Sequence, residues 1–361
     1  MALAPMADVT DAAFRRIIAK YGQRPQRQNG LRGGRANHYV TFTEFVSCDG
    51  LCSKGKKNLL PILKYSEKER PIVAQVFGAK SENFYESAKL IKKLGFDGID
   101  INMGCPDKKV LKQGAGAALI NNPKLAQEII RQTKKGASSL PVSIKTRIGY
   151  DKYDKKEFKK WLMALLETKP AVITIHGRTK KEMSLVPAHW DAIAEAVKIR
   201  NEFDSSNNRT LILGNGDVKS VGDAEEKARA SGVDGVMIGR AIFGNPWLFS
   251  HGYELRNSVF EIALRSAAAR VKMIFQQKNT SGYFKDSYFA IQSYSSPHLK
   301  LSVLLEHTKL FEKINKGQNF DVMKKHFKSY VCDFPGAKEL RIKLMACQNA
   351  KEAEKVMLPF L

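Results

Sequence analysis

Two patterns of hydrophobic and polar positions repeat along most of the chain. Short β-branched or apolar runs alternate with amphipathic stretches of helical length, which is typical of a parallel sheet with helical crossovers. The runs predict eight strands, over Met1–Ala4, Thr41–Phe45, Ile72–Phe77, Gly98–Asn102, Val142–Thr146, Val172–His176, Leu211–Gly214 and Gly235–Ile238. Helices are predicted between them, over Asp11–Lys20, Ser81–Leu94, Pro123–Lys135, Lys155–Glu167, Ala188–Arg200 and Val221–Ala230. Eight strand–helix units in about 250 residues indicate a (β/α)₈ barrel, the TIM-barrel fold.

The pattern changes after Phe249, where the strand-like runs stop. The remaining sequence predicts helices, over Phe260–Gln277, Leu301–Ile314 and Ala337–Gln348. We therefore predict a barrel domain over residues 1–249 and a small all-helical domain over residues 250–361. Two segments do not fit this division: Arg-rich residues 23–38 predict a loop insertion, and Asn279–His298 predicts a loop or a surface hairpin.

Polar side chains gather at the ends of several predicted strands. Ser143, Lys145 and Arg147 alternate with Val142 and Ile144, so the polar set shares one face of its strand. The same alternation gives inward-facing polar groups on three other strands, namely Gln75, Asp100, Asn102, Thr174 and His176. Burying an unpaired lysine costs several kcal/mol and a lone amide or imidazole roughly 1–3 kcal/mol, so these groups need shared partners. A polar ligand at the barrel mouth would provide them, although any one of these residues alone could be a hydrogen-bonded structural residue.

Two glycine-containing loops have the chemistry of a phosphate site. Asn215-Gly216-Asp217 follows the seventh predicted strand, and Gly239-Arg240 follows the eighth. Glycine lets backbone amides approach an anion, and the N-terminus of the next helix favours negative charge. Barrels commonly bind phosphate at these two loops, whereas Asn-Gly-Asp elsewhere would more often be an ordinary turn.

Charge and cysteine content narrow the choice of partners. The 361 residues include 60 Lys and Arg against 36 Asp and Glu, a formal net charge of +24, which favours a polyanion such as nucleic acid or an anionic membrane. We find no transmembrane run and no secretory signal, and we expect a cytoplasmic protein. The five cysteines include no C-x-x-C pair, so neither a disulfide framework nor a metal site is expected.

One cysteine occupies the position of a reactive group. Cys105 lies just past the fourth predicted strand, in the sequence Asn102-Met103-Gly104-Cys105-Pro106. Catalytic groups of barrels gather at the C-terminal ends of the strands, where a thiol can exchange a proton with a bound ligand. Elsewhere in a barrel a cysteine usually serves as a small apolar residue.

The order of these motifs resembles the tRNA-dihydrouridine synthase family, most nearly its bacterial B-type branch. The resemblance covers the whole chain and is carried by Leu3–Asp11, Gln75–Gly78, Asn102–Pro106, Gly114–Leu119, Lys145–Arg147, His176–Thr179, Asn215–Asp217 and Gly239-Arg240. In the tail it continues through Lys325-His326, Pro335-Gly336-Ala337 and Leu340-Arg341, which look like the family's helical RNA-binding domain.

The resemblance implies a flavin enzyme with FMN in the barrel mouth and NADPH as the reductant. The cofactor would be bound by Pro5, Met6, Ala7, Gln75, Lys145, His176, Asn215, Gly216, Asp217, Gly239 and Arg240. Reduced flavin would pass hydride to C6 of a uracil, and Cys105 would protonate C5 as the general acid. Asn102 and Arg178 are candidates for contacting the flipped uridine.

The resemblance also implies tRNA as the partner, and the net charge then supplies phosphate contacts. In the tail, Lys325, Lys328 and Arg341 are expected against the tRNA backbone; we expect no membrane partner and a monomer. The nearest alternative is an FMN barrel oxidoreductase of the dihydroorotate dehydrogenase type, acting on a small pyrimidine. A different class is an RNA-binding or chaperone protein with an inert barrel.

Overall fold

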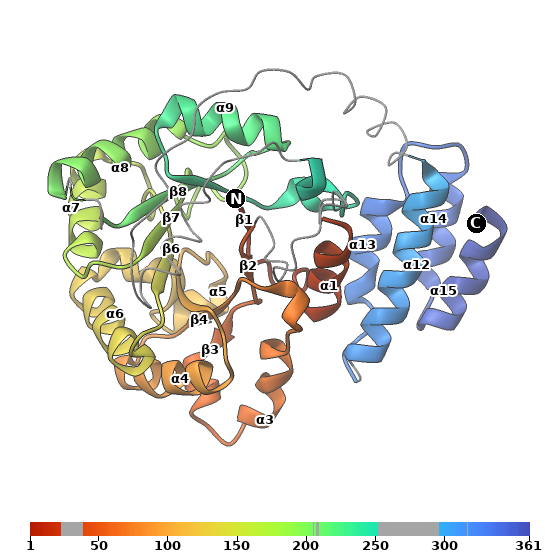
Figure 1. Cartoon of the computed structure of the whole chain (residues 1–361), viewed down its shortest axis with the longest axis horizontal. Helices are drawn as coiled ribbons and strands as arrows, with labels where there is room; N and C mark the ends of the chain where they lie inside the picture. Colours follow the sequence, from red (N-terminus) through yellow and green to blue (C-terminus); the bar gives the residue numbers. More distant parts are fainter. Residues whose placement is uncertain (23–38, 205, 207–208, 252–295, 316) are drawn as a thin grey trace, which may run out of the picture.

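A computed structural model describes residues 1–22, 39–204, 206, 209–251, 296–315 and 317–361 (Figure 1). Within these ranges, a barrel of parallel strands surrounded by helices lies beside a group of helices from the end of the chain. The expected insertion over residues 23–38, the expected helix Phe260–Gln277 and residues 279–295 lie outside the described residues. The boundary between the two predicted domains near residue 249 therefore stays a prediction.

The strands form one parallel sheet in the order β1-β9-β8-β7-β6-β5-β4-β2, with β3 also paired to β4. Between β1 and the residues preceding β2, a single parallel bridge joins Ala2 to Val40 and nearly closes the ring. Together with the surrounding helices, this confirms the predicted TIM-barrel fold followed by helices. The strands are β1 (Ala2–Leu3), β2 (Thr41–Phe42), β3 (Val46–Ser47), β4 (Ile72–Phe77), β5 (Gly98–Met103), β6 (Val142–Arg147), β7 (Val172–His176), β8 (Leu211–Asn215) and β9 (Gly235–Ile238).

The predicted second strand, Thr41–Phe45, is wrong as a single element. Only Thr41 and Phe42 form a strand there, β2, and a second short strand, β3, follows the predicted range. The two strands pair with successive parts of β4. Between the two strands, side chains accept hydrogen bonds from distant backbone amides. Thr43 Oγ1 accepts one from the Gln75 amide, and the Glu44 carboxylate accepts one from the Asp8 amide. Hydrogen bonds to residues distant in the sequence thus end β2 earlier than predicted.

Six helices of the barrel layer match their predicted positions to within a few residues. They are α1 (Ala12–Tyr21), α4 (Ser81–Lys93), α6 (Pro123–Ala137), α7 (Lys155–Leu166), α8 (Trp190–Phe203) and α9 (Val221–Ser231). Side-chain oxygens of Asp11, Asp154 and Ser220 cap the first turns of three of them, as short polar residues at an N-cap usually do. Helix α8 starts later than predicted, because the Ala188 amide bonds to Asp217 instead. Three short helices were not predicted, namely α2 (Cys48–Leu51), α3 (Lys56–Leu59) and α5 (Lys108–Lys112).

The strand alternation separates the two sides of the barrel wall as predicted. Side chains such as Ile144, Ile173 and Ile175 point outward and pack with the surrounding helices. A separate apolar cluster fills the interior toward the N-terminal ends of the strands and includes Val73 and Val172. The interior is therefore apolar at one end, and the polar residues are left for the other end.

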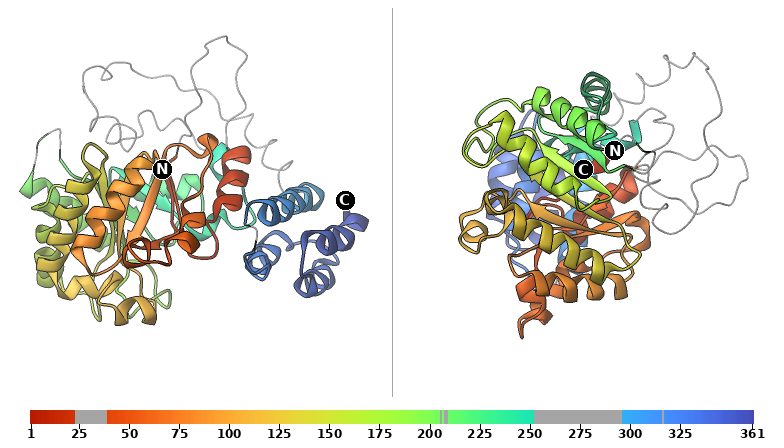
Figure 2. Two further views of the ribbon diagram at one scale, coloured as in Figure 1. Left: turned by 90° about the horizontal axis from the view of Figure 1, so that it is seen from below. Right: turned by 90° about the vertical axis from the view of Figure 1, so that its left-hand side faces the viewer.

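The C-terminal helices are α12 (Pro297–Ile314), α13 (Val322–Tyr330), α14 (Ala337–Ala346) and α15 (Ala350–Met357). Helix α12 begins before the predicted Leu301, inside the segment read as a loop or hairpin, while α13 and α15 were missed. The group lies on one side of the barrel, against α1 (Figure 2). Helix α1 serves both cores: Ile18 packs with the barrel, whereas Ala13 and Ile17 pack with the C-terminal helices. Phe14 packs with the barrel and also contacts α12 and α13. None of the helices that the structure describes is both long enough and apolar enough to span a membrane.

Candidate active site

The inward polar residues of three neighbouring strands form a hydrogen-bonded network below the C-terminal end of the barrel, which we call the mouth. Gln75 Nε2 donates to Asp100 at 2.7 Å, and Ser143 Oγ donates to the other Asp100 oxygen at 2.5 Å. Asn102 Nδ2 in turn donates to Gln75 Oε1 at 3.1 Å. Burial raises the pKa of Asp100 to about 6, although these donors and Lys145 favour its charged form. The network fixes the side chains that form the floor of the mouth.

Cys105 lies directly above this floor on a tightly held loop. Asn102 Oδ1 accepts hydrogen bonds from the amides of Gly104 and Cys105, at 3.1 and 2.9 Å. From the next strand, Arg147 Nε donates to the Gly104 carbonyl at 2.7 Å. Gly116, at φ 62°, passes so close that a Cβ there would meet the Cys105 carbonyl at 2.8 Å. Burial raises the pKa of the half-buried Cys105 thiol, so it carries its proton at neutral pH.

Lys145 brings a positive charge to the same place. Its Nζ lies 3.3 Å from Asn215 Oδ1 on β8, while Asn215 Nδ2 donates to the Met237 carbonyl on β9. Burial, followed by the nearby Arg147 charge, lowers the pKa of Lys145 to about 8. The ammonium is therefore mostly charged at neutral pH but poorly compensated by protein groups, a state that an anionic ligand would relieve.

His176 and three arginines continue this positive region. Burial, then the charges of Lys145, Arg147, Arg178 and Arg240, lower the pKa of His176 to about 2, so the ring is neutral. Arg178 is buried and donates to the Val186 carbonyl and to Asp217, whose other oxygen accepts from Arg240 at 2.8 Å. Asp217 thereby orients both arginines, and the exposed Arg240 remains at the rim.

The loop after β1 lies at the same end of the barrel, beside the loop after β9. The Met6 amide donates a hydrogen bond to Thr10 Oγ1, and the Thr10 hydroxyl donates one to the Met6 carbonyl. These two bonds make the loop a compact turn. A Cβ added to Gly239 would lie 3.8 Å from Met6 Sδ, so the loops after β1 and β9 are neighbours. Pro5 and Met6 are half-buried and Ala7 is exposed. The sequence-predicted cofactor residues thus come from six strands and meet at one end of the barrel.

Two residues of the mouth were not among the predicted site residues. Arg147 anchors the Cys105 loop and also donates to the Thr179 carbonyl at 3.0 Å. Glu44 holds the Asp8 amide, and burial, followed by the nearby Asp11 charge, raises its pKa to about 7. Arg147 had a signal in the sequence, its place on the polar face of a strand. Glu44 had only its position at a strand end.

Two predicted uridine contacts have structural partners. Asn102 and Arg178 are both buried, and each uses its polar atoms to hold a loop of the mouth. Among the predicted tRNA contacts, Lys325 is exposed on α13 and lies 3.1 Å from Asp8 of the β1 loop. Lys328 is exposed as well, whereas Arg341 donates to the Val331 carbonyl at 2.7 Å. Of these three residues, Lys325 therefore lies beside the loop after β1.

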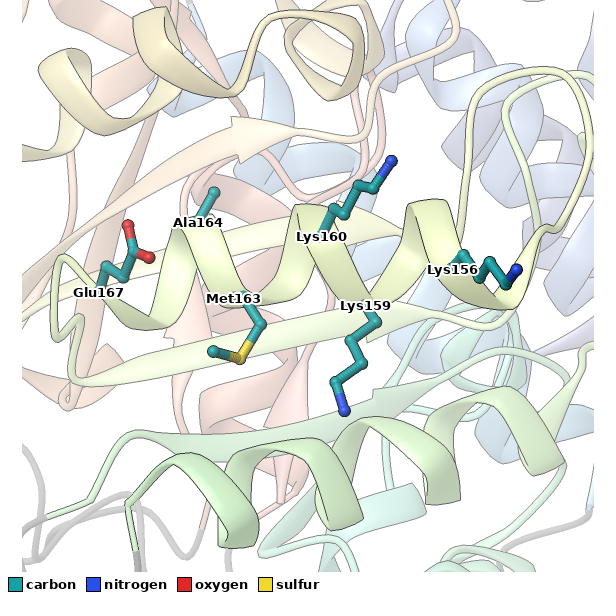
Figure 3. Close-up of a pocket in the computed structure, with 6 residues that line it drawn as sticks. All are labelled: Lys156, Lys159, Lys160, Met163, Ala164 and Glu167. Atoms are coloured by element: carbon teal, nitrogen blue, oxygen red, sulfur yellow. The ribbon is translucent and has the colours of Figure 1, made fainter.

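A hollow on the outside of the barrel has no connection with these residues. It is lined by side chains of α7 and of the residue that follows it, namely Lys156, Lys159, Lys160, Met163, Ala164 and Glu167 (Figure 3). Two of these lysines form exposed ion pairs, Lys159 with Glu202 and Lys160 with Glu157. We regard the hollow as a surface depression beside a helix and not as the candidate site.

Comparison with known proteins agrees with this arrangement. The sequence profile described as dihydrouridine synthase (Dus) matches residues 2–360, which includes both the barrel and the C-terminal helices. The chain belongs to the dihydrouridine synthase family. It is 37% identical to a probable tRNA-dihydrouridine synthase of Staphylococcus aureus, over 99% of this chain and 92% of that protein. It is 36% identical to probable tRNA-dihydrouridine synthase 2 of Bacillus subtilis, over 98% of this chain and 90% of that protein.

Proposed function

We propose that the protein is a tRNA-dihydrouridine synthase that reduces the C5–C6 bond of tRNA uridines with FMN and NADPH. The observation that carries the proposal is the convergence of a protonated Cys105 and several cations at one barrel mouth in a member of this family. Names of relatives that match almost the whole chain support tRNA as the substrate class.

The residues of the mouth fit a flavin phosphate. Four cations lie near enough to His176 to lower its pKa, and Asp217 forms ion pairs with two of them. The excess of positive charge favours binding of an anion. Arg240 and the amides of the Gly216 and Gly239 loops would hold the phosphate, and Gln75 and Lys145 would contact the polar edge of the ring. Lys145 would also favour negative charge on that ring. Pro5, Met6 and Ala7 would line one face, with His176 nearby.

Flavin mononucleotide reduced by NADPH would supply the hydride that adds to C6 of the uracil. The addition leaves enolate character at C5, which requires a proton. Cys105 would donate that proton from its thiol, and the resulting thiolate would regain one from solvent. A raised thiol pKa suits this role, because it keeps the proton in place until the base develops charge.

The remaining residues would position these groups. Asn102 and Arg147 hold the Cys105 loop from two strands, so the thiol keeps its direction without a bound ligand. Glu44 fixes the loop after β1 through the Asp8 amide. Lys325 and Lys328 would contact tRNA phosphates, and the affinity that such contacts provide depends strongly on salt concentration.

The test uses the purified full-length protein. We expect yellow protein with flavin absorbance, bleached by NADPH without oxygen and restored by unmodified tRNA, with dihydrouridine detected in that tRNA by mass spectrometry. Colourless protein after reconstitution with FMN would contradict the proposal. Product from orotate-type pyrimidines instead of tRNA would identify the alternative barrel oxidoreductase.

A further inference from the structure

The loop between β7 and α8, residues 177–189, carries two exposed apolar side chains at the mouth. Leu185 is 86% exposed and Met183 is 48% exposed. Single exposed apolar residues are common on proteins and need no explanation. Here two of them, with one residue between them, lie on the loop that follows β7, the strand that ends at His176. Their positions therefore call for a partner.

Hydrogen bonds attach this loop to the barrel on both sides of the two apolar residues. At its start the amides of Lys180 and Lys181 donate to the carbonyls of Gly149 and Tyr150, at 3.0 and 2.9 Å. At its end Arg178 Nε donates to the Val186 carbonyl at 2.6 Å. Between these anchors, the Thr179 amide donates to Glu182 at 2.7 Å, and Glu182 Oε1 lies 3.1 Å from His189 Nε2. The tip therefore lies between two bonded parts of the loop.

The backbone at the tip is unusual for an apolar residue. Met183 has a φ of 55°, the left-handed region that side chains other than Gly and Asn rarely adopt. Strained conformations of this kind cost on the order of 1–3 kcal/mol and cluster at ligand-binding positions. A large thioether side chain occupies this position and is 48% exposed to solvent.

The charges around the tip identify the chemistry of the partner. Lys180 lies with its Nζ 4.5 Å from the centre of the Tyr150 ring, and Lys181 is exposed beside it. With the net charge of +24, an apolar tip flanked by lysines suits a polyanion that also offers flat apolar surfaces. Nucleic acid bases beside phosphates have this combination.

We propose that Met183 and Leu185 form an apolar wedge that packs against the RNA bases left behind when the reactive uridine enters the mouth. The inference rests on the proposed function, because Cys105 lies inside the mouth and a stacked uridine has to leave its neighbours to reach it. Unstacking a base costs a few kcal/mol, and proteins that distort nucleic acid often insert Met or Leu at the opened step. The wedge is thus a positioning element and makes no contact with the reacting atoms.

The test compares variants in a single-turnover assay, in which NADPH-reduced enzyme is oxidised by increasing concentrations of unmodified tRNA. Met183→Asn with Leu185→Ser removes the wedge, and asparagine suits the left-handed backbone at position 183. We expect the rate at saturating tRNA to fall at least about tenfold, as for one lost stacking contact in the reacting complex, while the dissociation constant for tRNA changes less than about threefold. Flavin reduction by NADPH without RNA should be unchanged.

Two further variants complete the design. Leu185→Phe keeps a flat apolar side chain and should retain at least half of the wild-type rate. Leu94→Ser removes another exposed apolar residue, at the end of α4 on the opposite side of the barrel, and should have no effect. A saturating rate of the double variant within about twofold of wild type would overturn the wedge while leaving the proposed function intact. A loss seen only in the dissociation constant would also overturn it, since that indicates plain contact. Wild-type protein that forms no dihydrouridine would overturn both.

Discussion

Two buried polar regions of this molecule are built in opposite ways. In the mouth, Gln75, Asp100, Asn102 and Ser143 satisfy one another through hydrogen bonds. The second region is the seam, by which we mean the contact of α1 with α12 and α13. In the seam both ring nitrogens of His307, His326 Nε2 and the Tyr330 hydroxyl have no hydrogen-bond partner among the described residues.

In the seam, the rings of the buried histidines pack against other rings. Phe14 of α1 stacks on His326 with ring centres 5.1 Å apart, and His307 meets His326 edge-on at 4.5 Å. Burial lowers the pKa of His326 to about 3 and that of His307 well below its ordinary value, so both rings are neutral. The difference teaches that buried polar residues alone do not mark a site. The mouth differs in having a satisfied network beside the cations Lys145 and Arg240.

The comparison predicts that changes in the mouth remove chemistry and leave folding intact. Replacing Cys105 by alanine should reduce dihydrouridine formation about 10²-fold or more, because a general acid contributes that much. Reduction of the flavin by NADPH and the melting temperature should stay close to wild type. Mass spectrometry of tRNA after a fixed reaction time gives the yield, and a normal yield would exclude Cys105 as the acid.

A second change in the mouth tests the cofactor site. Lys145→Met should weaken FMN binding roughly tenfold to a hundredfold, since a hydrogen bond to a charged group is worth about 1.5–3 kcal/mol. Stability of the apoprotein should not fall, because burial already disfavours the charged lysine. Fluorescence titration with FMN measures the affinity. Lys156→Met on α7 is the control, and equal loss in both variants would argue against a specific contact.

The seam should respond to acid in the opposite way, by losing stability. Its histidines ionise at about pH 6.5 when unfolded and far lower when folded, so unfolding takes up protons. Stability is fully present above about pH 6.5 and is lost as the pH falls toward about 3, by up to ~1.4 kcal/mol per pH unit for each histidine. Urea unfolding at several pH values measures this slope.

The variant His326→Phe isolates the seam from other titrating groups. Glu44 and Asp100 have raised pKa values and act in the opposite direction, but they are present in both proteins. Lys325, whose charge also disfavours protonated His326, is likewise retained. We therefore expect a flatter loss of stability between pH 7 and 5 in the variant. Parallel slopes would show that His326 contributes nothing to the acid sensitivity.

The smallest predicted effect concerns the exposed lysine between the two regions. Lys325→Ala removes a surface ion pair with Asp8, which contributes little to stability. We expect tRNA affinity to fall a few-fold and the salt dependence of binding to weaken by about one phosphate contact. Binding titrations at several salt concentrations test this, with Lys92→Ala on the far end of the barrel as the control. Unchanged salt dependence would remove Lys325 from the RNA surface.

The strands and the faces of the barrel could be predicted because both follow from local alternation. Lys145, His176 and Asn215 come together since parallel strands end at the same rim, a rule that needs no long-range contact. The end of β2 at Phe42 could not be predicted, because the next two residues bond to Gln75 and Asp8.

The same reasoning explains the incomplete prediction of the site. The pairing of Arg178 with Asp217 joins residues 39 positions apart, and the sequence gives no sign that these two loops touch. The seam was equally hidden, since α1 resembles an ordinary amphipathic helix and its second apolar face packs against helices distant in the sequence.

Helix α1 contributes side chains to both cores, and Lys20 and Tyr21 near its end also bond to Glu306 of α12. These contacts within the folded chain hold α12 and α13 beside the barrel. On the proposed function, the distance from Cys105 to the lysines of α13 would then act as a fixed length along the tRNA. The uridine that reaches the thiol would follow from the geometry of the tRNA more than from the bases that surround the target.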